Sequence, residues 1–174
     1  MRKKSMKSQK KTDELINKYV KKKSKWSGKI IVDDNAEMYG KLWNCNIVTK
    51  SETCAHIILH EQLHARSISY YDEITYINFK KIEEATVELL AQEIGLKEKI
   101  KLEESYYDEM VDDLRYINKK LNLYKNNLQF SVELLNKNVD ERLDWLDSLI
   151  FDRMMKGGTI EKYEEFAKRM DRLR

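Results

Sequence analysis

Residues 56–64 read His56-Ile57-Ile58-Leu59-His60-Glu61-Gln62-Leu63-His64, and this stretch contains all three histidines of the 174-residue chain. In an α-helix, positions i and i+4 lie one turn apart on the same face. The imidazoles of His60 and His64 could therefore bind one metal ion. Glu61 lies beside them, where its carboxylate could reach a water molecule held by that ion. The stretch predicts a helix that carries two metal ligands.

His56 extends the same face by one more turn. Three histidines along a straight helix span about 12 Å from first to last, so they cannot all bind one tetrahedral ion. We expect His56 to be a polar lining or surface residue.

The helix around the histidines has apparent start and stop signals. Thr49 and Glu52 have the spacing of a capping box, which predicts a helix start there. Apolar residues then recur at helical spacing as far as Ala65, and the pattern ends at about Ser67. We therefore expect the histidine pair in the middle of a helix.

Two short β-branched or alternating runs precede this helix. They are Lys29–Val32 and Leu42–Val48, and both are typical of strands. Asp33-Asp34-Asn35 and Gly40 between them favour turns. We expect an antiparallel pair and hence a small antiparallel sheet before the histidine helix.

A second helix should supply the third metal ligand. After a linker at Tyr70–Tyr76, apolar residues from Ile82 to Leu90 keep helical spacing, and Gly95 marks the expected helix end. This helix carries Glu83, Glu84 and Glu88, and nineteen residues separate His64 from Glu84. Either Glu83 or Glu84 could bind the ion. Glu84 is favoured because Glu88, one turn further on, could then accept the free ring N–H of a ligand histidine.

The sequence His60-Glu61-Gln62-Leu63-His64 followed by Glu84-Ala85-Thr86-Val87-Glu88 resembles the glutamate-zincin pattern of metallopeptidases. Residues 57–90 are also similar to compact peptidases of phages and mobile elements, the ImmA/IrrE type. This resemblance implies one Zn²⁺ bound by His60, His64 and Glu84, with Glu61 as general base and Glu88 or Glu83 in the surrounding shell. It further implies that an edge strand, here Leu42–Val48, holds the substrate.

The developing negative charge on a substrate carbonyl oxygen would also need a hydrogen-bond donor. Tyr70, Tyr71 and Tyr76 are near enough in sequence to supply a phenolic O–H, and the sequence does not choose among them. A simpler interpretation of the whole pattern also exists, because HExxH occurs by chance and a run such as Glu83–Glu88 is usually a solvated helix face.

The rest of the chain is predicted to be helical. Three apolar stripes, beginning near Tyr107, Leu143 and Ile160, are typical of helices that bury one face in a core. Asn136–Asn138 and Gly157-Gly158 separate them. We expect an α+β protein, mainly helical, with a basic N-terminal arm (1–27), a zincin-like core (28–100) and a helical C-terminal region packed on it (101–174).

Composition and charge narrow the range of partners and locations. The chain has 41% apolar and 36% charged residues, and no apolar run approaches the roughly 20 residues that cross a bilayer. We expect no membrane association and a cytoplasmic or intravirion location. Residues 1–29 hold twelve Lys/Arg and two acids, a charge of about +10 against about −7 elsewhere. This arm could contact nucleic acid or an acidic partner, or dock through Leu15, Ile16, Tyr19 and Val20.

The leading hypothesis is a zinc metallopeptidase that acts on a protein or peptide substrate. One alternative is a phage or mobile-element structural or morphogenesis protein with a zincin-like module, because the basic arm on a small acidic body suits an assembly partner. Another is a regulatory protease that cleaves a repressor, which the ImmA/IrrE resemblance implies.

Overall fold

The computed structural model describes residues 11–36, 40–43, 46–67, 73–157 and 160–174. The elements in chain order are β1 (Ile30–Val32), β2 (Gly40–Trp43), β3 (Asn46–Thr49), α2 (Ala55–His64), α3 (Glu73–Asn78), α4 (Lys80–Glu98), α5 (Asp108–Leu121), α6 (Asn127–Asn136), α7 (Val139–Met155) and α8 (Ile160–Leu173). The predicted α+β class, mainly helical with a small sheet before the histidine helix, is confirmed.

The chain forms two compact units. Unit 1 holds Met1–Ser67 and Ala91–Glu103, and unit 2 holds Ile68–Leu90 and Glu104–Arg174. Helix α4 is continuous, with its first half in unit 2 and its second half in unit 1.

The sheet in unit 1 has the strand order β1-β3-β2 and is mixed, so the prediction of a purely antiparallel sheet is wrong. The expected strand Leu42–Val48 is divided between β2 and β3, which pair antiparallel with Leu42 opposite Ile47. Strand β1 adds to the other side of β3 in parallel. The burial explains this order, because Ile47 and Val48 of the central strand are buried whereas Ile31 and Val32 of β1 are 45% and 49% exposed.

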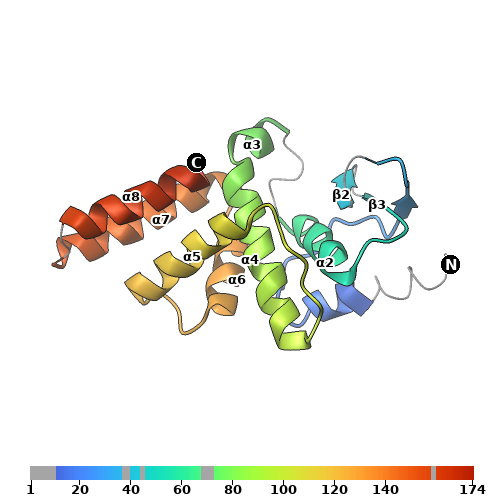
Figure 1. Cartoon of the computed structure of the whole chain (residues 1–174), viewed down its shortest axis with the longest axis horizontal. Helices are drawn as coiled ribbons and strands as arrows, with labels where there is room; N and C mark the ends of the chain where they lie inside the picture. Colours follow the sequence, from blue (N-terminus) through green and yellow to red (C-terminus); the bar gives the residue numbers. More distant parts are fainter. Residues whose placement is uncertain (1–10, 37–39, 44–45, 68–72, 158–159) are drawn as a thin grey trace. The chain divides into compact units, whose positions relative to one another are not determined.

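Helix α2 packs against β2 and β3, as Figure 1 shows. The predicted capping box is wrong: Thr49 is the buried last residue of β3, and the helix begins at Ala55 with Cys54 as its N-cap. The helix ends at His64, and the next three residues form hydrogen-bonded turns in which Arg66 N–H donates to Leu63 O and Ser67 N–H donates to His64 O. His60 and His64 therefore lie in the last turns of the helix rather than in its middle, and their one-turn spacing is kept.

The N-terminal segment belongs to unit 1 from residue 11 onward. Residues 11–16 are helical, and Ile16 and Val20 are almost fully buried, as expected for docking. The buried Arg66 guanidinium donates to Asp13 Oδ1 at 2.7 Å and to Asn17 Oδ1 at 2.9 Å. These contacts attach the segment to Arg66, just after the C-terminal end of α2.

Helix α4 does not end at Gly95, so that prediction is wrong. The helix runs to Glu98, and the chain reverses at Lys99, whose φ is 57°. A Cβ on Gly95 would come within 2.5 Å of Leu102 Cδ2. A side chain at this position would have to displace the end of the Leu102 side chain, which lies on the returning chain. The predicted linker at Tyr70–Tyr76 is also partly helical, because α3 begins at Glu73.

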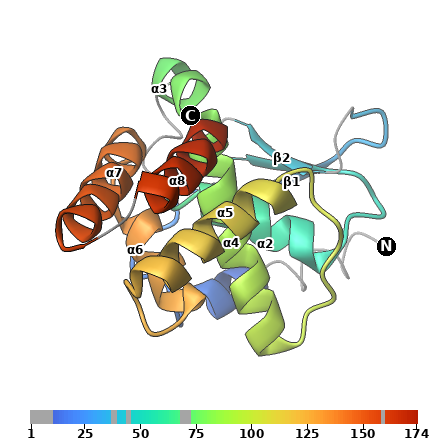
Figure 2. The same ribbon diagram turned by 60° about the vertical axis from the view of Figure 1, so that its left-hand side comes forward.

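Unit 2 contains a core built from α4 and the C-terminal helices. Its buried residues are Ile82, Ala85, Leu89, Val111, Leu114, Ile117, Leu121, Phe130, Leu134, Val139, Leu143, Leu146, Ile150, Phe166, Met170 and Leu173. Most residues of the predicted apolar stripes lie in or against this core, but Tyr163 of the last stripe is 52% exposed, so its prediction as a core residue is wrong. The predicted breaks at Asn136–Asn138 and Gly157 lie at the ends of α6 and α7, and Gly158 lies outside the described residues. Figures 1 and 2 both show α7 and α8 side by side.

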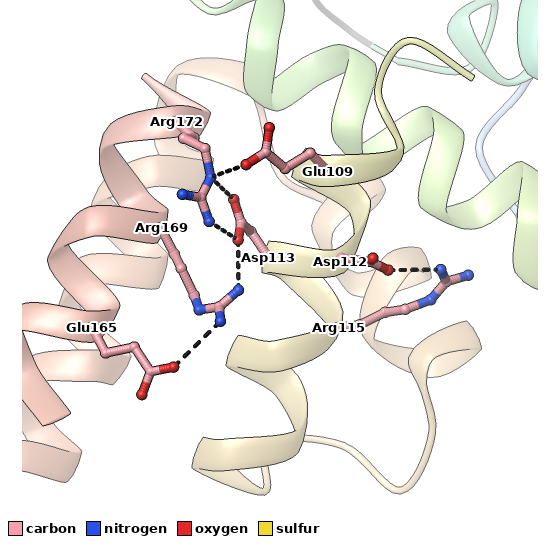
Figure 3. Close-up of polar contacts among 7 residues, drawn as sticks. All are labelled: Glu109, Asp112, Asp113, Arg115, Glu165, Arg169 and Arg172. Atoms are coloured by element: carbon pink, nitrogen blue, oxygen red, sulfur yellow. Dashed lines mark hydrogen bonds and ion pairs between the residues drawn. The ribbon is translucent and has the colours of Figure 1, made fainter. Parts of the chain in front are cut away.

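A buried carboxylate also joins α5 to α8 (Figure 3). Asp113 is 1% exposed, and it accepts hydrogen bonds from Arg169 Nη1 at 2.7 Å and from Arg172 Nε at 2.6 Å.

Among the described residues, no helix has both the length and the apolar composition that crossing a membrane requires.

Candidate metal centre

His60, His64 and Glu84 form a group that could hold a metal ion. The ligand atoms that these residues offer all lie within 4.8 Å of one another. The two Nε2 atoms of the histidines are 3.0 Å apart, and their rings are inclined at 73°. The helical spacing of residues 60 and 64 produces this convergence, and Glu84 comes from the first turns of α4.

The geometry agrees with a tetrahedral ion. Two ligands about 2.0–2.1 Å from zinc at tetrahedral angles are about 3.3 Å apart, close to the observed separation of the two Nε2 atoms. Two neutral imidazoles and one carboxylate are also a donor set found in catalytic zinc sites, which keep a fourth position for water. The residues present therefore fit a metal ion of this kind.

The burial of the group differs between its members. His64 and Glu84 are each 5% exposed, whereas His60 is only half-buried. A buried carboxylate beside two imidazoles loses much of its hydration, and a cation is one partner that would compensate for this loss.

The structure brings Glu84, and not Glu83, to the imidazoles. Glu83 Oε2 accepts a hydrogen bond from Arg142 Nη1 of α7 at 2.5 Å, and both side chains are fully buried. Neighbouring helix positions point about 100° apart, so the two carboxylates face different partners. The alternative of Glu83 as third ligand and its role in the surrounding shell are not supported by this placement.

Tyr76 contacts the candidate ligand directly. Its phenolic O–H donates to Glu84 Oε1 at 2.5 Å. Burial, followed by the neighbouring Glu84 carboxylate, raises the pKa of the Tyr76 phenol well above its ordinary value of 10.0. The phenol therefore keeps its proton as a donor at physiological pH. Tyr70 and Tyr71, the other two tyrosines considered as donors, lie outside the described residues.

The run Glu83–Glu88 is not a solvated helix face, which removes the simpler interpretation of this segment. Glu83 is 0% exposed, Glu84 5% and Glu88 2%, and Thr86 between them is also buried. Glu61, beside the histidines on α2, is 6% exposed. Burying several carboxylates away from water is unfavourable unless other charges compensate for the lost hydration. Clusters of buried ionisable groups of this kind are typical of functional sites.

His56 was expected to be a polar lining or surface residue, and the surface alternative is wrong because the side chain is buried. It is 3% exposed, and its Nδ1 accepts the backbone N–H of Glu103 at 3.3 Å. His56 fixes the segment that follows α4 instead of extending the metal group.

Arg142 is the residue that the sequence analysis missed. It stands between Val139 and Leu146 at helical spacing, on the face of α7 that enters the core. A charged residue in the middle of an apolar stripe indicates a buried partner of opposite charge, and this signal was available in the sequence.

The structure also alters which part of the predicted strand Leu42–Val48 could hold a substrate. Residues 46–49 form the central strand β3, whose two sides are occupied by β1 and β2, so this part of Leu42–Val48 cannot accept a peptide strand. Strand β2, Gly40–Trp43, is at the edge of the sheet in the part of the chain that the structure describes.

Comparisons with known proteins do not add to this site. No family model matches the chain, and neither the curated proteins nor the solved structures contain a match.

Proposed function

We propose that the protein is a zinc-dependent metallopeptidase. The observation that supports this proposal best is the convergence of His60, His64 and Glu84, whose ligand atoms lie within 4.8 Å of one another. Two separate helices, α2 and α4, supply this group, and both contribute residue types that zinc prefers.

When bound, zinc would polarise a peptide carbonyl and lower the pKa of a coordinated water molecule to about 7. The protein side chains would then move the protons. The Glu61 carboxylate would accept a proton from the attacking water and deliver it to the nitrogen of the leaving amine. Glu61 is 6% exposed and follows His60 directly on α2, so its carboxylate belongs to the same part of the helix as the two imidazoles.

The substrate would be a protein or peptide held in extended form. A peptide strand can add to an exposed sheet edge through backbone hydrogen bonds. Strand β2 is the candidate edge, because it pairs with β3 on one side and lies in the sheet against which α2 packs. Backbone recognition of this kind places few demands on the substrate side chains.

The test is a Glu61→Gln variant assayed on a mixture of internally quenched peptides. Loss of the general base should lower kcat/KM by at least about 100-fold, since such catalysis contributes roughly 10²–10⁴. Zinc content should stay the same because Glu61 is not a ligand. The control is Glu52→Gln, the same chemical change at an exposed position outside the metal group. Unchanged peptidase activity in Glu61→Gln would refute the proposed mechanism.

A further inference from the structure

We infer that Tyr76 is a positioning residue that holds the Glu84 carboxylate for the metal ion, and that it is not the donor to the substrate oxyanion. The inference rests on the proposed function and assigns one of its residues a different role from the one that sequence reasoning suggested.

The first argument is the hydrogen bond itself. Tyr76 has one O–H proton, and this proton is donated to Glu84 Oε1 at 2.5 Å. A hydrogen bond to an ionised carboxylate is roughly twice as strong as one between neutral groups. Donation to a substrate oxygen would first require this bond to break. In contrast, a carboxylate with one oxygen held by a donor presents its other oxygen to a metal in a fixed direction.

The second argument is the local backbone, which makes the pair rigid. Helix α3 is connected to α4 through Phe79, whose N–H donates to Thr75 O at 3.1 Å and whose carbonyl accepts from Glu83 N–H at 3.0 Å. The Phe79 side chain packs against the core of unit 2. Tyr76 and Glu84 are thus held on one continuous stretch of hydrogen-bonded backbone.

The third argument is the way in which α3 is oriented. Ile74 and Ile77 of this short helix are 72% and 64% exposed, whereas Tyr76 is half-buried. An amphipathic helix normally buries its isoleucines in preference to a tyrosine. The side of α3 that faces the protein is therefore the one that brings the phenol to Glu84, as a supporting role for this carboxylate requires.

The two roles for Tyr76 predict different results for Tyr76→Phe, which removes only the hydroxyl. As a positioning residue, Tyr76 should affect metal affinity: the Kd for zinc rises about 10–100-fold, and kcat at saturating zinc stays within a few fold of the original value. As an oxyanion donor, it should leave the zinc Kd unchanged and lower kcat by about 10²–10³.

The experiment is a competition titration with a chromophoric zinc chelator, combined with kcat measured at saturating zinc. The matched control is Tyr116→Phe, which removes a tyrosine hydrogen bond to Glu165 in the same unit but outside the metal group. This control should leave the zinc Kd unchanged. In a Glu84→Ala background, Tyr76→Phe should cause no further loss of affinity, because the carboxylate that it holds is gone.

The visible spectrum of the Co²⁺-loaded protein gives an independent readout of ligand geometry, and it should change in Tyr76→Phe and not in Tyr116→Phe. A zinc Kd in Tyr76→Phe equal to that of the unmodified protein would overturn the inference while leaving the proposed function in place. An unmodified protein that binds no zinc would instead overturn the proposed function.

Discussion

At the scale of single residues, Glu83 and Glu84 show how two adjacent carboxylates acquire separate roles. Glu83 is paired with Arg142, and Glu84 accepts the Tyr76 hydroxyl and faces the histidines. Each acid is buried, so each needs a partner. The Arg142 pair holds the Glu83 carboxylate away from the imidazoles, so that Glu84 alone joins them in the group that could hold a metal ion.

The first prediction concerns Arg142. Arg142→Met should destabilise the protein by about 3–5 kcal/mol, because removal of one member of a buried ion pair leaves an uncompensated charge. Urea denaturation measures this change in the free energy of unfolding. The double variant Arg142→Met with Glu83→Gln should recover most of the loss, because the buried charge is then absent.

Arg115→Met is the matched control for this prediction. Its partner Asp112 is 73% exposed, so the loss of this pair should change the free energy of unfolding by less than about 1 kcal/mol. A loss in Arg142→Met as small as that in the control would contradict the account of Glu83.

The candidate ligands could be predicted at this scale, but their partners could not. The spacing of His60 and His64, and the i+4 relation of Glu84 to Glu88, are local properties that the sequence displays directly. The partner of Glu83 lies 59 residues further along the chain. Such a pairing depends on how α7 packs in unit 2, which periodicity does not describe.

At the scale of elements, the buried Asp113 joins α5 to α8 through Arg169 and Arg172 (Figure 3). The side chains of Arg169 and Arg172 are 23% and 29% exposed, so both are partly in contact with solvent. The contact of Asp113 with Arg169 and Arg172, called the clamp below, should therefore contribute less to the free energy of unfolding than the fully buried pair of Arg142 and Glu83. It nevertheless orients α8, the last helix of the chain, on α5.

We predict that Asp113→Asn lowers the free energy of unfolding by about 1–3 kcal/mol, the usual range for lost hydrogen bonds to a charged group. Thermal denaturation followed by circular dichroism is the measurement. Asp112→Asn, one residue away on the exposed side of α5 in Figure 3, is the control and should change stability by less than about 1 kcal/mol. Equal effects of the two variants would show that the clamp contributes little.

Element type and approximate position were predictable for most strands and helices, whereas ends and pairings were not. The alternation of apolar and polar residues indicated where strands form, but it did not indicate how they pair. The parallel pairing of β1 with β3 follows from the position of β3 as the central strand of the sheet. Gly95 was interpreted as a helix end because glycine is common there. The helix instead continues past Gly95 to Glu98, and the returning chain places Leu102 beside the glycine, which a local pattern cannot reveal.

At the scale of the whole molecule, the spacing of apolar residues predicted the α+β class, and the charge distribution separates the basic N-terminal segment from the acidic remainder. The docking predicted for this segment is confirmed at Ile16 and Val20, whereas the Asp13 contact with Arg66, which also attaches it to unit 1, was not predicted. Charge describes solvation and partners, whereas attachment depends on a few apolar residues within a polar segment. Any test of nucleic-acid binding by the arm should therefore keep these residues.

The central claim is that one zinc ion is bound by His60, His64 and Glu84. The most direct measurement is anomalous scattering at the zinc edge from crystals of the zinc-loaded protein, with His64→Ala as the control. We predict one strong peak about 2.0–2.2 Å from both Nε2 atoms and from a Glu84 oxygen, and no peak in the variant. The absence of a peak at this position in the unmodified protein, or a peak bound by other residues, would contradict the account.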